Sequence, residues 1–142
     1  MEKKKVNKDG NVLLFLDDIR DPIQCTEYMY TRLKNVDIYR DTDWNIVRTY
    51  KDFCEFIKVH GLPDLISFDH DLADDYSFMD TLNKADWYSN VYNRPFTGYD
   101  CAKFLIAYCF DKNNKLPKFI VHSMNPVGIS NIQNLLMSYI NR

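Results

Sequence analysis

Residues 11–16, Asn-Val-Leu-Leu-Phe-Leu, run directly into Asp17 and Asp18. A short, uninterrupted apolar run that ends in polar residues is typical of a strand buried on both faces of a parallel sheet. An edge strand would expose part of such a run, so residues 11–16 are predicted to lie inside the sheet. The two carboxylates would then stand at the carboxyl end of a central strand.

Further strands and helices alternate along the chain. Three more runs are predicted as strands: 45–49, 65–68 and 119–121. Three helix patterns begin at residues typical of helix caps: Thr49, Thr97 and Asn125. Strands that alternate with helices pair in parallel through right-handed crossovers. We therefore predict an α/β fold with about four parallel strands in the order 2-1-3-4 and helices on both faces.

Two stretches do not follow this pattern. Residues 23–44 show no clear period and would form either one helix or an added hairpin. Residues 73–96 form a long insertion rich in Asp and Tyr, and an insertion of that length in a compact domain is usually functional or mobile. We expect residues 1–10 to be a flexible N-terminus and residues 11–142 to form a single domain.

The composition narrows the class of protein. The chain has 142 residues, 46% of them hydrophobic, which is enough for one ordinary core and excludes disorder. A net charge of −2 without a basic stripe argues against general DNA binding, and no apolar run is long enough to span a membrane. Four cysteines without metal-type spacing and the lack of a signal peptide indicate a cytoplasmic location. The many aromatic residues leave an oligomer open.

Acidic residues gather where the predicted strands end. Of the 20 acidic residues 17 are Asp, and the pair Asp17-Asp18 and Asp69 each come directly after a predicted strand. The carboxyl ends of parallel strands meet at one edge of the sheet, where ligands of this class of fold bind. Three converging carboxylates repel one another unless a cation lies between them, and oxygen ligands suit Mg²⁺ or Mn²⁺. Two nearby histidines keep Mn²⁺ or Zn²⁺ open as well.

Two of the three histidines lie at the same edge. His70 follows Asp69, and His122 follows the fourth strand, whereas His60 ends a helix and is read as structural. Imidazole titrates near neutral pH, so His70 and His122 are predicted to share general acid and base roles. Asp71 would either bind the metal or orient a histidine.

Several donors at this edge are predicted to bind phosphate. Arg20 would either fork onto phosphate oxygens or simply pair with Asp21 on the surface. Ser123 and Asn125 add polar groups beside the fourth strand. The helix starts at Thr97-Gly98 and after Asn125 should point unpaired N–H groups toward the same edge, where they favour an anion.

Four motifs carry a family resemblance. They occur in this order in the chain: Leu16-Asp17-Asp18-Ile19-Arg20-Asp21-Pro22, Ser67-Phe68-Asp69-His70-Asp71-Leu72, Thr97-Gly98-Tyr99-Asp100 and His122-Ser123-Met124-Asn125-Pro126-Val127-Gly128. The double acid, the strand-end Asp69 and the strand-end Ser123 resemble the receiver domain of two-component signalling. Receivers, however, carry a fifth strand that ends in Lys, and this sequence offers no counterpart of either.

With its added histidines, the chain more closely resembles the cyclic-phosphate processing receiver-like domains over about residues 11–140. The resemblance implies a receiver- or flavodoxin-like three-layer sandwich. It also implies hydrolysis of a cyclic phosphate on a nucleotide, an RNA end or an ADP-ribose derivative, in bacteria or their phages, where such signals serve defence.

We therefore predict a metal-assisted phosphodiesterase that opens a cyclic phosphate. Asp17, Asp18 and Asp69 would hold the metal, and Asp69 and Asp71 would also belong to the catalytic group. Two alternatives stay open. The same pocket would serve a non-catalytic module that sequesters a cyclic nucleotide, or Asp69 would be the acceptor of a degenerate phosphoacceptor receiver.

Overall fold

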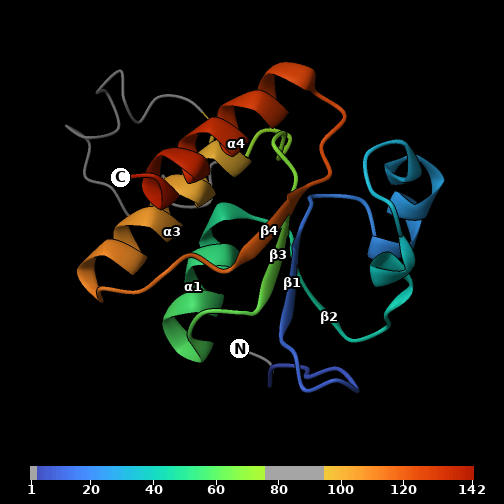
Figure 1. The fold of residues 1–142 in the computed structure, drawn as a ribbon, viewed down its shortest axis with the longest axis horizontal. Helices are drawn as coiled ribbons and strands as arrows, with labels where there is room; N and C mark the ends of the chain where they lie inside the picture. Colours follow the sequence, from blue (N-terminus) through green and yellow to red (C-terminus); the bar gives the residue numbers. More distant parts are fainter. Residues whose placement is uncertain (1–2, 76–94) are drawn as a thin grey trace.

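The computed structural model describes residues 3–75 and 95–142 and has a parallel sheet at its centre (Figure 1). Its strands are β1 (Leu13–Leu16), β2 (Trp44–Val47), β3 (Leu65–Phe68) and β4 (Lys118–Val121). They are ordered β2-β1-β3-β4, and every pairing is parallel. The predicted fold class and strand order are therefore confirmed, with β1 inside the sheet.

The strand register aligns the four carboxyl ends. Leu16 at the end of β1 pairs with Val47 of β2 and Phe68 of β3, and Phe68 pairs with Val121 of β4. The residues that directly follow β1, β3 and β4 therefore emerge side by side. Backbone hydrogen bonds continue this alignment one step further, because the N–H of Asp69 donates to the carbonyl of Leu16 at 2.9 Å.

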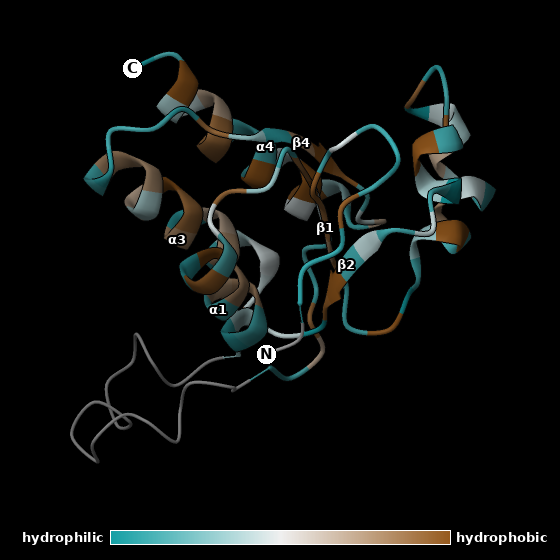
Figure 2. Cartoon of the chain, turned by 90° about the horizontal axis from the view of Figure 1, so that it is seen from below, coloured by the Kyte–Doolittle hydropathy of each residue, from teal (hydrophilic) through white to brown (hydrophobic). Residues whose placement is uncertain are grey.

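In the described part of the chain, three α-helices cover one face of the sheet (Figures 1 and 2). They are α1 (Tyr50–His60), α3 (Gly98–Asp111) and α4 (Pro126–Ile140). Each begins at the predicted cap. Thr49 accepts from the N–H of Asp52 at 3.1 Å, Thr97 forms a capping box with Asp100, and Asn125 accepts from a first-turn N–H. Their apolar sides pack on the alternate strand residues Leu14, Leu16, Ile66 and Phe68.

Short 3₁₀ helices cover the other face, to the right in Figure 1. They are η1 (Pro22–Glu27), η2 (Met29–Thr31) and η3 (Asp37–Arg40). The expectation of one helix or a hairpin over 23–44 is therefore wrong. These turns are instead held by tertiary packing of scattered large side chains, namely Cys25, Met29, Tyr39 and Trp44, against Leu13 and Phe15 of β1. These side chains are buried without a regular helical spacing in the sequence, so no period predicted the turns.

Residues 76–94 of the predicted insertion lie outside the described residues. Its two ends meet, because the N–H of Phe96 donates to the carbonyl of Asp75 at 2.6 Å. Near the N-terminus, the N–H of Lys5 donates to the side chain of Asn45 at 2.7 Å. The division into residues 1–10 and 11–142 stays a prediction. Within the described ranges, β4 pairs with β3 alone, and no helix is both long and apolar enough to cross a membrane.

Candidate functional site

A cavity of about 430 Å³ lies at the carboxyl ends of the strands. Its walls come from the loops after β1, β3 and β4. The lining residues are Asp18, Ile19, Arg20, Asp69, Asp71, Ala73, Ser123, Met124 and Asn125. Most of the predicted polar site residues therefore surround one space, at the edge where the fold predicts ligand binding.

Asp69, which lines this cavity, belongs to a cluster of three side chains of the kinds that bind metals. One oxygen each of Asp17 and Asp69 and one ring nitrogen of His122 all lie within 4.8 Å of one another, and all three residues are buried. Asp17 and Asp69 were predicted as metal ligands. Asp18 lies on the cavity wall and is not one of the three. His122 takes the third place in the cluster.

Asp17 uses all of its acceptor positions. Its Oδ1 accepts from the backbone N–H groups of Ile19 and Arg20 at 3.0 and 2.8 Å. Its Oδ2 lies 3.2 Å from Nη1 of Arg20 and 3.0 Å from Nε2 of His122. A carboxylate offers about four lone-pair positions. A cation that binds Oδ2 would therefore compete with the partly exposed Arg20 guanidinium.

The carboxyl groups differ in their ionisation. Burial opposes ionisation of Asp17, but hydrogen bonds from His122 and from the backbone of Arg20 and Ile19 outweigh burial and lower its pKa to about 2. Burial, together with the charge of Asp17, raises the pKa of Asp69 to about 7. Burial and the charge of Asp17 also raise the pKa of Asp18.

These carboxyl groups fit a divalent cation. Two buried carboxyl groups face each other, and the charge of one resists ionisation of the other. A bound cation would remove that repulsion, and hard oxygen donors suit Mg²⁺ or Mn²⁺. The cluster therefore could hold a metal ion, without defining which one.

His122 lies in the interior. Its side chain is fully buried, and its ring stacks on Phe15 with centroids 4.5 Å apart and planes 4° apart. Nδ1 lies 2.6 Å from Oγ of Ser67, and Oγ of Ser67 lies 2.8 Å from the hydroxyl of Tyr39. Burial lowers the pKa of His122, against the effect of Asp17. The His122 ring is not among the residues that line the cavity. The acid–base role predicted for His122 stays a prediction.

His70 and Asp71 form a pair beside the cavity. Nδ1 of His70 lies 2.8 Å from Oδ1 of Asp71, and Asp71 lines the cavity. Of the two roles left open for Asp71, this contact matches orientation of a histidine. The His70 ring packs against Gly128, where a Cβ atom would come within 2.4 Å of the ring. Glycine at this position of α4 leaves room for the imidazole.

The predicted phosphate donors fall into two groups. Arg20, Ser123 and Asn125 line the cavity. Thr97 and Gly98 do not, and their groups have structural partners. The Thr97 side chain caps α3, and the N–H of Gly98 donates to the carbonyl of His70 at 2.7 Å. Phosphate binding by Thr97 and Gly98 stays a prediction, while their observed contacts attach α3 to the sheet edge.

The 3₁₀ layer and β2 supply contacts that the sequence did not reveal. The hydroxyl of Tyr28 donates to the carbonyl of His122 at 2.6 Å, and Nη1 of Arg32 donates to the carbonyl of Val121 at 3.3 Å. Nη1 of Arg48 donates to the carbonyl of Asp17 at 3.2 Å. Tyr28 and Arg32 come from residues 23–44, which show no period, and Arg48 comes from the predicted strand 45–49. Only their type, aromatic or Arg near the site, could have drawn attention.

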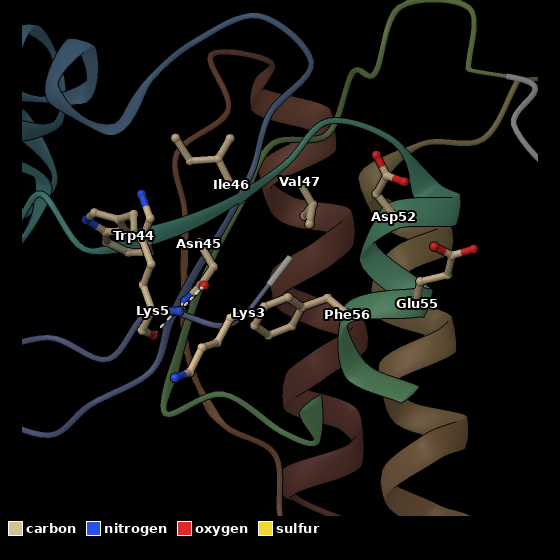
Figure 3. Close-up of a pocket in the computed structure, with 9 residues that line it drawn as sticks. All are labelled: Lys3, Lys5, Trp44, Asn45, Ile46, Val47, Asp52, Glu55 and Phe56. Atoms are coloured by element: carbon tan, nitrogen blue, oxygen red, sulfur yellow. Dashed lines mark hydrogen bonds between the residues drawn. The ribbon is translucent and has the colours of Figure 1, made fainter. Parts of the chain in front are cut away.

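A second cavity of about 420 Å³ lies beside β2, between the N-terminal segment and α1 (Figure 3). Its lining residues are Lys3, Lys5, Trp44, Asn45, Ile46, Val47, Asp52, Glu55 and Phe56. None of them was predicted as a site residue. None of them belongs to the four sequence motifs either. The strand-end cavity, which motif residues line, is therefore the candidate site.

Fold and site together define a receiver-like α/β domain with a buried acidic cluster at the strand ends. Residues 12–138 match the family described as cyclic-phosphate processing receiver domain, and the chain belongs to that family. No curated protein matches the chain.

Among solved structures, the chain is similar to one described as "Yeast Spc42 Trimeric Coiled-Coil Amino Acids 181-211" fused to another structure. The identity is 13% and the TM-score 0.44, over 91% of this chain and 75% of that chain. A likeness at this level carries no argument about function.

Proposed function

We propose that the protein is a metal-assisted phosphodiesterase that hydrolyses a cyclic phosphate of a nucleotide, an RNA end or an ADP-ribose-type signal. The observation that carries the proposal is the buried carboxyl pair, Asp17 and Asp69, of which Asp69 lines the same cavity as Arg20, Ser123 and Asn125. Carboxylates for a cation and donors for an anion thus share one space, which is the arrangement that a phosphate ester needs.

Asp17 and Asp69 would hold the cation, with Asp18 close enough on the cavity wall to serve through water or after a side-chain rotation. When bound, Mg²⁺ or Mn²⁺ would neutralise charge on the non-bridging oxygens of the phosphate. Two findings support this assignment: the chain belongs to the cyclic-phosphate processing receiver family, and Asp17 and Asp69 lie in one buried cluster.

Arg20 would bind a non-bridging oxygen once it leaves Asp17. A guanidinium forks onto phosphate as readily as onto carboxylate. Oγ of Ser123 already accepts from the N–H of Asn125 at 3.0 Å, so its own hydrogen is available for the ligand. The amide of Asn125 caps α4 through its oxygen and leaves its N–H₂ directed toward Asp71, at 3.5 Å.

His70 is the proposed acid–base group. Asp71 fixes Nδ1, which leaves Nε2 to exchange a proton with the reacting groups. In the reaction a water oxygen bonds to phosphorus, one ring P–O bond breaks, and the water proton passes by way of His70 to the departing oxygen. The product is an opened phosphate monoester.

One observation favours a second function. Of the two predicted acid–base histidines, only His70 lies next to the cavity wall, while His122 is buried with both nitrogens bonded. A module that holds a cyclic nucleotide without cleaving it needs no second imidazole at the ligand. A cytoplasmic module of this kind would bind and sequester cyclic-nucleotide signals in phage–bacterium conflict.

A ligand panel separates the two functions. Excess protein is incubated with Mg²⁺ and a panel of cyclic nucleotides and 2′,3′-cyclic RNA ends, then denatured, and the ligands are read by mass spectrometry. We expect one class of ligand to be opened by the wild type and not by Asp69→Asn. Measurable binding with every ligand recovered intact would establish the binding module instead.

A further inference from the structure

A chain of buried hydrogen bonds connects the 3₁₀ layer to the site. It runs from the hydroxyl of Tyr39 to Oγ of Ser67 at 2.8 Å, and from there to Nδ1 of His122 at 2.6 Å. Nε2 of His122 continues it to Oδ2 of Asp17 at 3.0 Å. All four residues are buried, so their polar groups need hydrogen-bond partners inside the protein.

The hydrogens of this chain have one consistent direction. Among the described residues, the hydroxyl of Tyr39 has Ser67 as its acceptor, so Tyr39 donates. Oδ2 of Asp17 can only accept, so Nε2 of His122 must carry a hydrogen; in the neutral ring Nδ1 then holds the lone pair and accepts the hydrogen of Ser67. The ring hydrogen of His122 therefore sits on Nε2 and points at Asp17. The reverse direction would leave the Tyr39 hydrogen without an acceptor.

The backbone and the ring of His122 are held as firmly as its nitrogens. Tyr28 donates to the carbonyl of His122 at 2.6 Å, and Nη2 of Arg32 lies 3.5 Å from the same oxygen. Phe15 covers one face of the ring in a parallel stack. A ring fixed in this way is suited to orient a neighbour and is poorly placed to follow a reacting ligand.

We propose that His122 is a positioning residue which, directed by Ser67 and Tyr39, holds Asp17 in place through its Nε2–H group. His122 is then neither a metal ligand through Nε2 nor the acid–base group at the substrate. The hydrogen-bond direction stands on the geometry alone. Its consequence for cation binding by Asp17 rests on the proposed function.

The first test needs neither ligand nor activity. Long-range ¹⁵N–¹H NMR of the wild type at neutral pH reports which imidazole nitrogen carries hydrogen, and the His122 signals are assigned by their absence in His122→Gln. We expect a protonated Nε2 and an unprotonated Nδ1. A hydrogen on Nδ1, alone or together with Nε2, would overturn the proposal.

Two amide variants form a matched pair for the second test. The amide nitrogen of His122→Gln reaches the place of Nε2 and still donates to Asp17, whereas His122→Asn reaches only the place of Nδ1, beside Ser67. Neither side chain titrates. Removal of a partner that orients a metal ligand typically weakens metal binding about 10- to 100-fold. We expect that loss of Mg²⁺ or Mn²⁺ affinity in His122→Asn and a change of less than about threefold in His122→Gln.

The outcomes of the pair are distinct. Equal metal affinity in both amides would overturn the positioning role, and so would loss of turnover in His122→Gln with metal binding intact, because an acid–base group cannot be replaced by an amide. If the wild type binds no cation, the metal part of the proposed function fails, while the NMR result still decides the direction of the hydrogen bonds.

A milder variant covers the case in which both amides fail to fold. Tyr39→Phe removes one hydroxyl from the head of the chain, and Tyr139→Phe, whose hydroxyl donates to the carbonyl of Asn114 at 2.9 Å, is its matched control. We expect Tyr39→Phe to shift the Nδ1 resonance of His122, because Ser67 loses its donor. Identical His122 spectra in both phenylalanine variants would contradict the proposed chain of hydrogen bonds from Tyr39 through Ser67 to His122.

Discussion

Replacement of Asp69 by Asn should remove a contribution to stability that falls as pH rises. The pKa of Asp69 is raised from 3.8 to about 7 by burial and by the charge of Asp17. Its folded pKa therefore lies above its unfolded pKa, and the protonated carboxyl stabilises the native state. That contribution is fully present below pH 3.8 and is lost as pH rises through about 7.

The magnitude follows from linkage. Between pH 8 and pH 5, a group with these two pKa values adds about 3 kcal/mol to the free energy of unfolding, and coupling to Asp17 reduces this to about 1–3 kcal/mol. His122 acts in the opposite direction in this window, since burial lowers its pKa. The difference between wild type and Asp69→Asn cancels that effect, because Asn is a neutral shape match.

The assay is urea denaturation of both proteins at pH 5 and pH 8 in EDTA, repeated at pH 8 with millimolar Mg²⁺. We expect the wild type to lose about 1–3 kcal/mol relative to Asp69→Asn between pH 5 and pH 8. Mg²⁺ should restore stability at pH 8 in the wild type alone, by mass action. Parallel pH curves for the two proteins would refute the assigned ionisation of Asp69.

Three further changes test other parts of the site. Arg20→Met should tighten Mn²⁺ binding about tenfold, because the guanidinium no longer competes for Asp17, and should weaken binding of inorganic phosphate. Paramagnetic resonance measures the Mn²⁺ affinity and calorimetry the phosphate affinity, and a loss of both affinities would contradict this competition. His70→Gln should lower single-turnover hydrolysis about 10²- to 10⁴-fold while the ligand still binds, and an unchanged rate would remove His70 from the mechanism. Gly98→Ala should destabilise the fold by about 3 kcal/mol in urea, since its Cβ atom would lie 1.8 Å from a backbone carbonyl just after β3, and a loss below about 0.5 kcal/mol would show that the contact is not tight.

The regular half of the fold was readable from the sequence because local and global preferences agree there. Residues 11–16 could only be an inner strand, and β1 lies between β2 and β3. Thr49, Thr97 and Asn125 begin the three helices at the predicted residues. Capping depends on a side chain and the backbone beside it, so short-range sequence is sufficient.

The 3₁₀ layer was not readable in the same way. Its turns are stabilised by Tyr39 and Trp44, whose rings stack with centroids 5.9 Å apart and pack on β1, a strand distant in the sequence. No local period in the sequence indicates such contacts. The hydrogen bond between Tyr39 and Ser67 belongs to the same class. Ser67 is one polar residue within an apolar strand. The sequence alone does not indicate that it bonds to Tyr39 and His122.

The site was predictable in position and less so in the roles of its members. Strand order alone brings Asp17, Asp69 and His122 to one edge. Whether each side chain then points to the cavity or to the interior depends on the pleat and on its partners. His122 turns inward to Ser67, and Asp18 turns toward the cavity, which spacing along the chain does not specify.

The proposed hydrolysis is best tested by single-turnover incubation of excess wild-type protein with a cyclic-phosphate ligand, Mg²⁺ and water enriched in ¹⁸O. We expect an opened phosphate monoester that carries one heavy oxygen on phosphorus, and none of this product with Asp69→Asn under the same conditions. Recovery of the intact cyclic ligand from a wild-type protein that measurably binds it, across the whole panel, would contradict hydrolysis and identify a binding module.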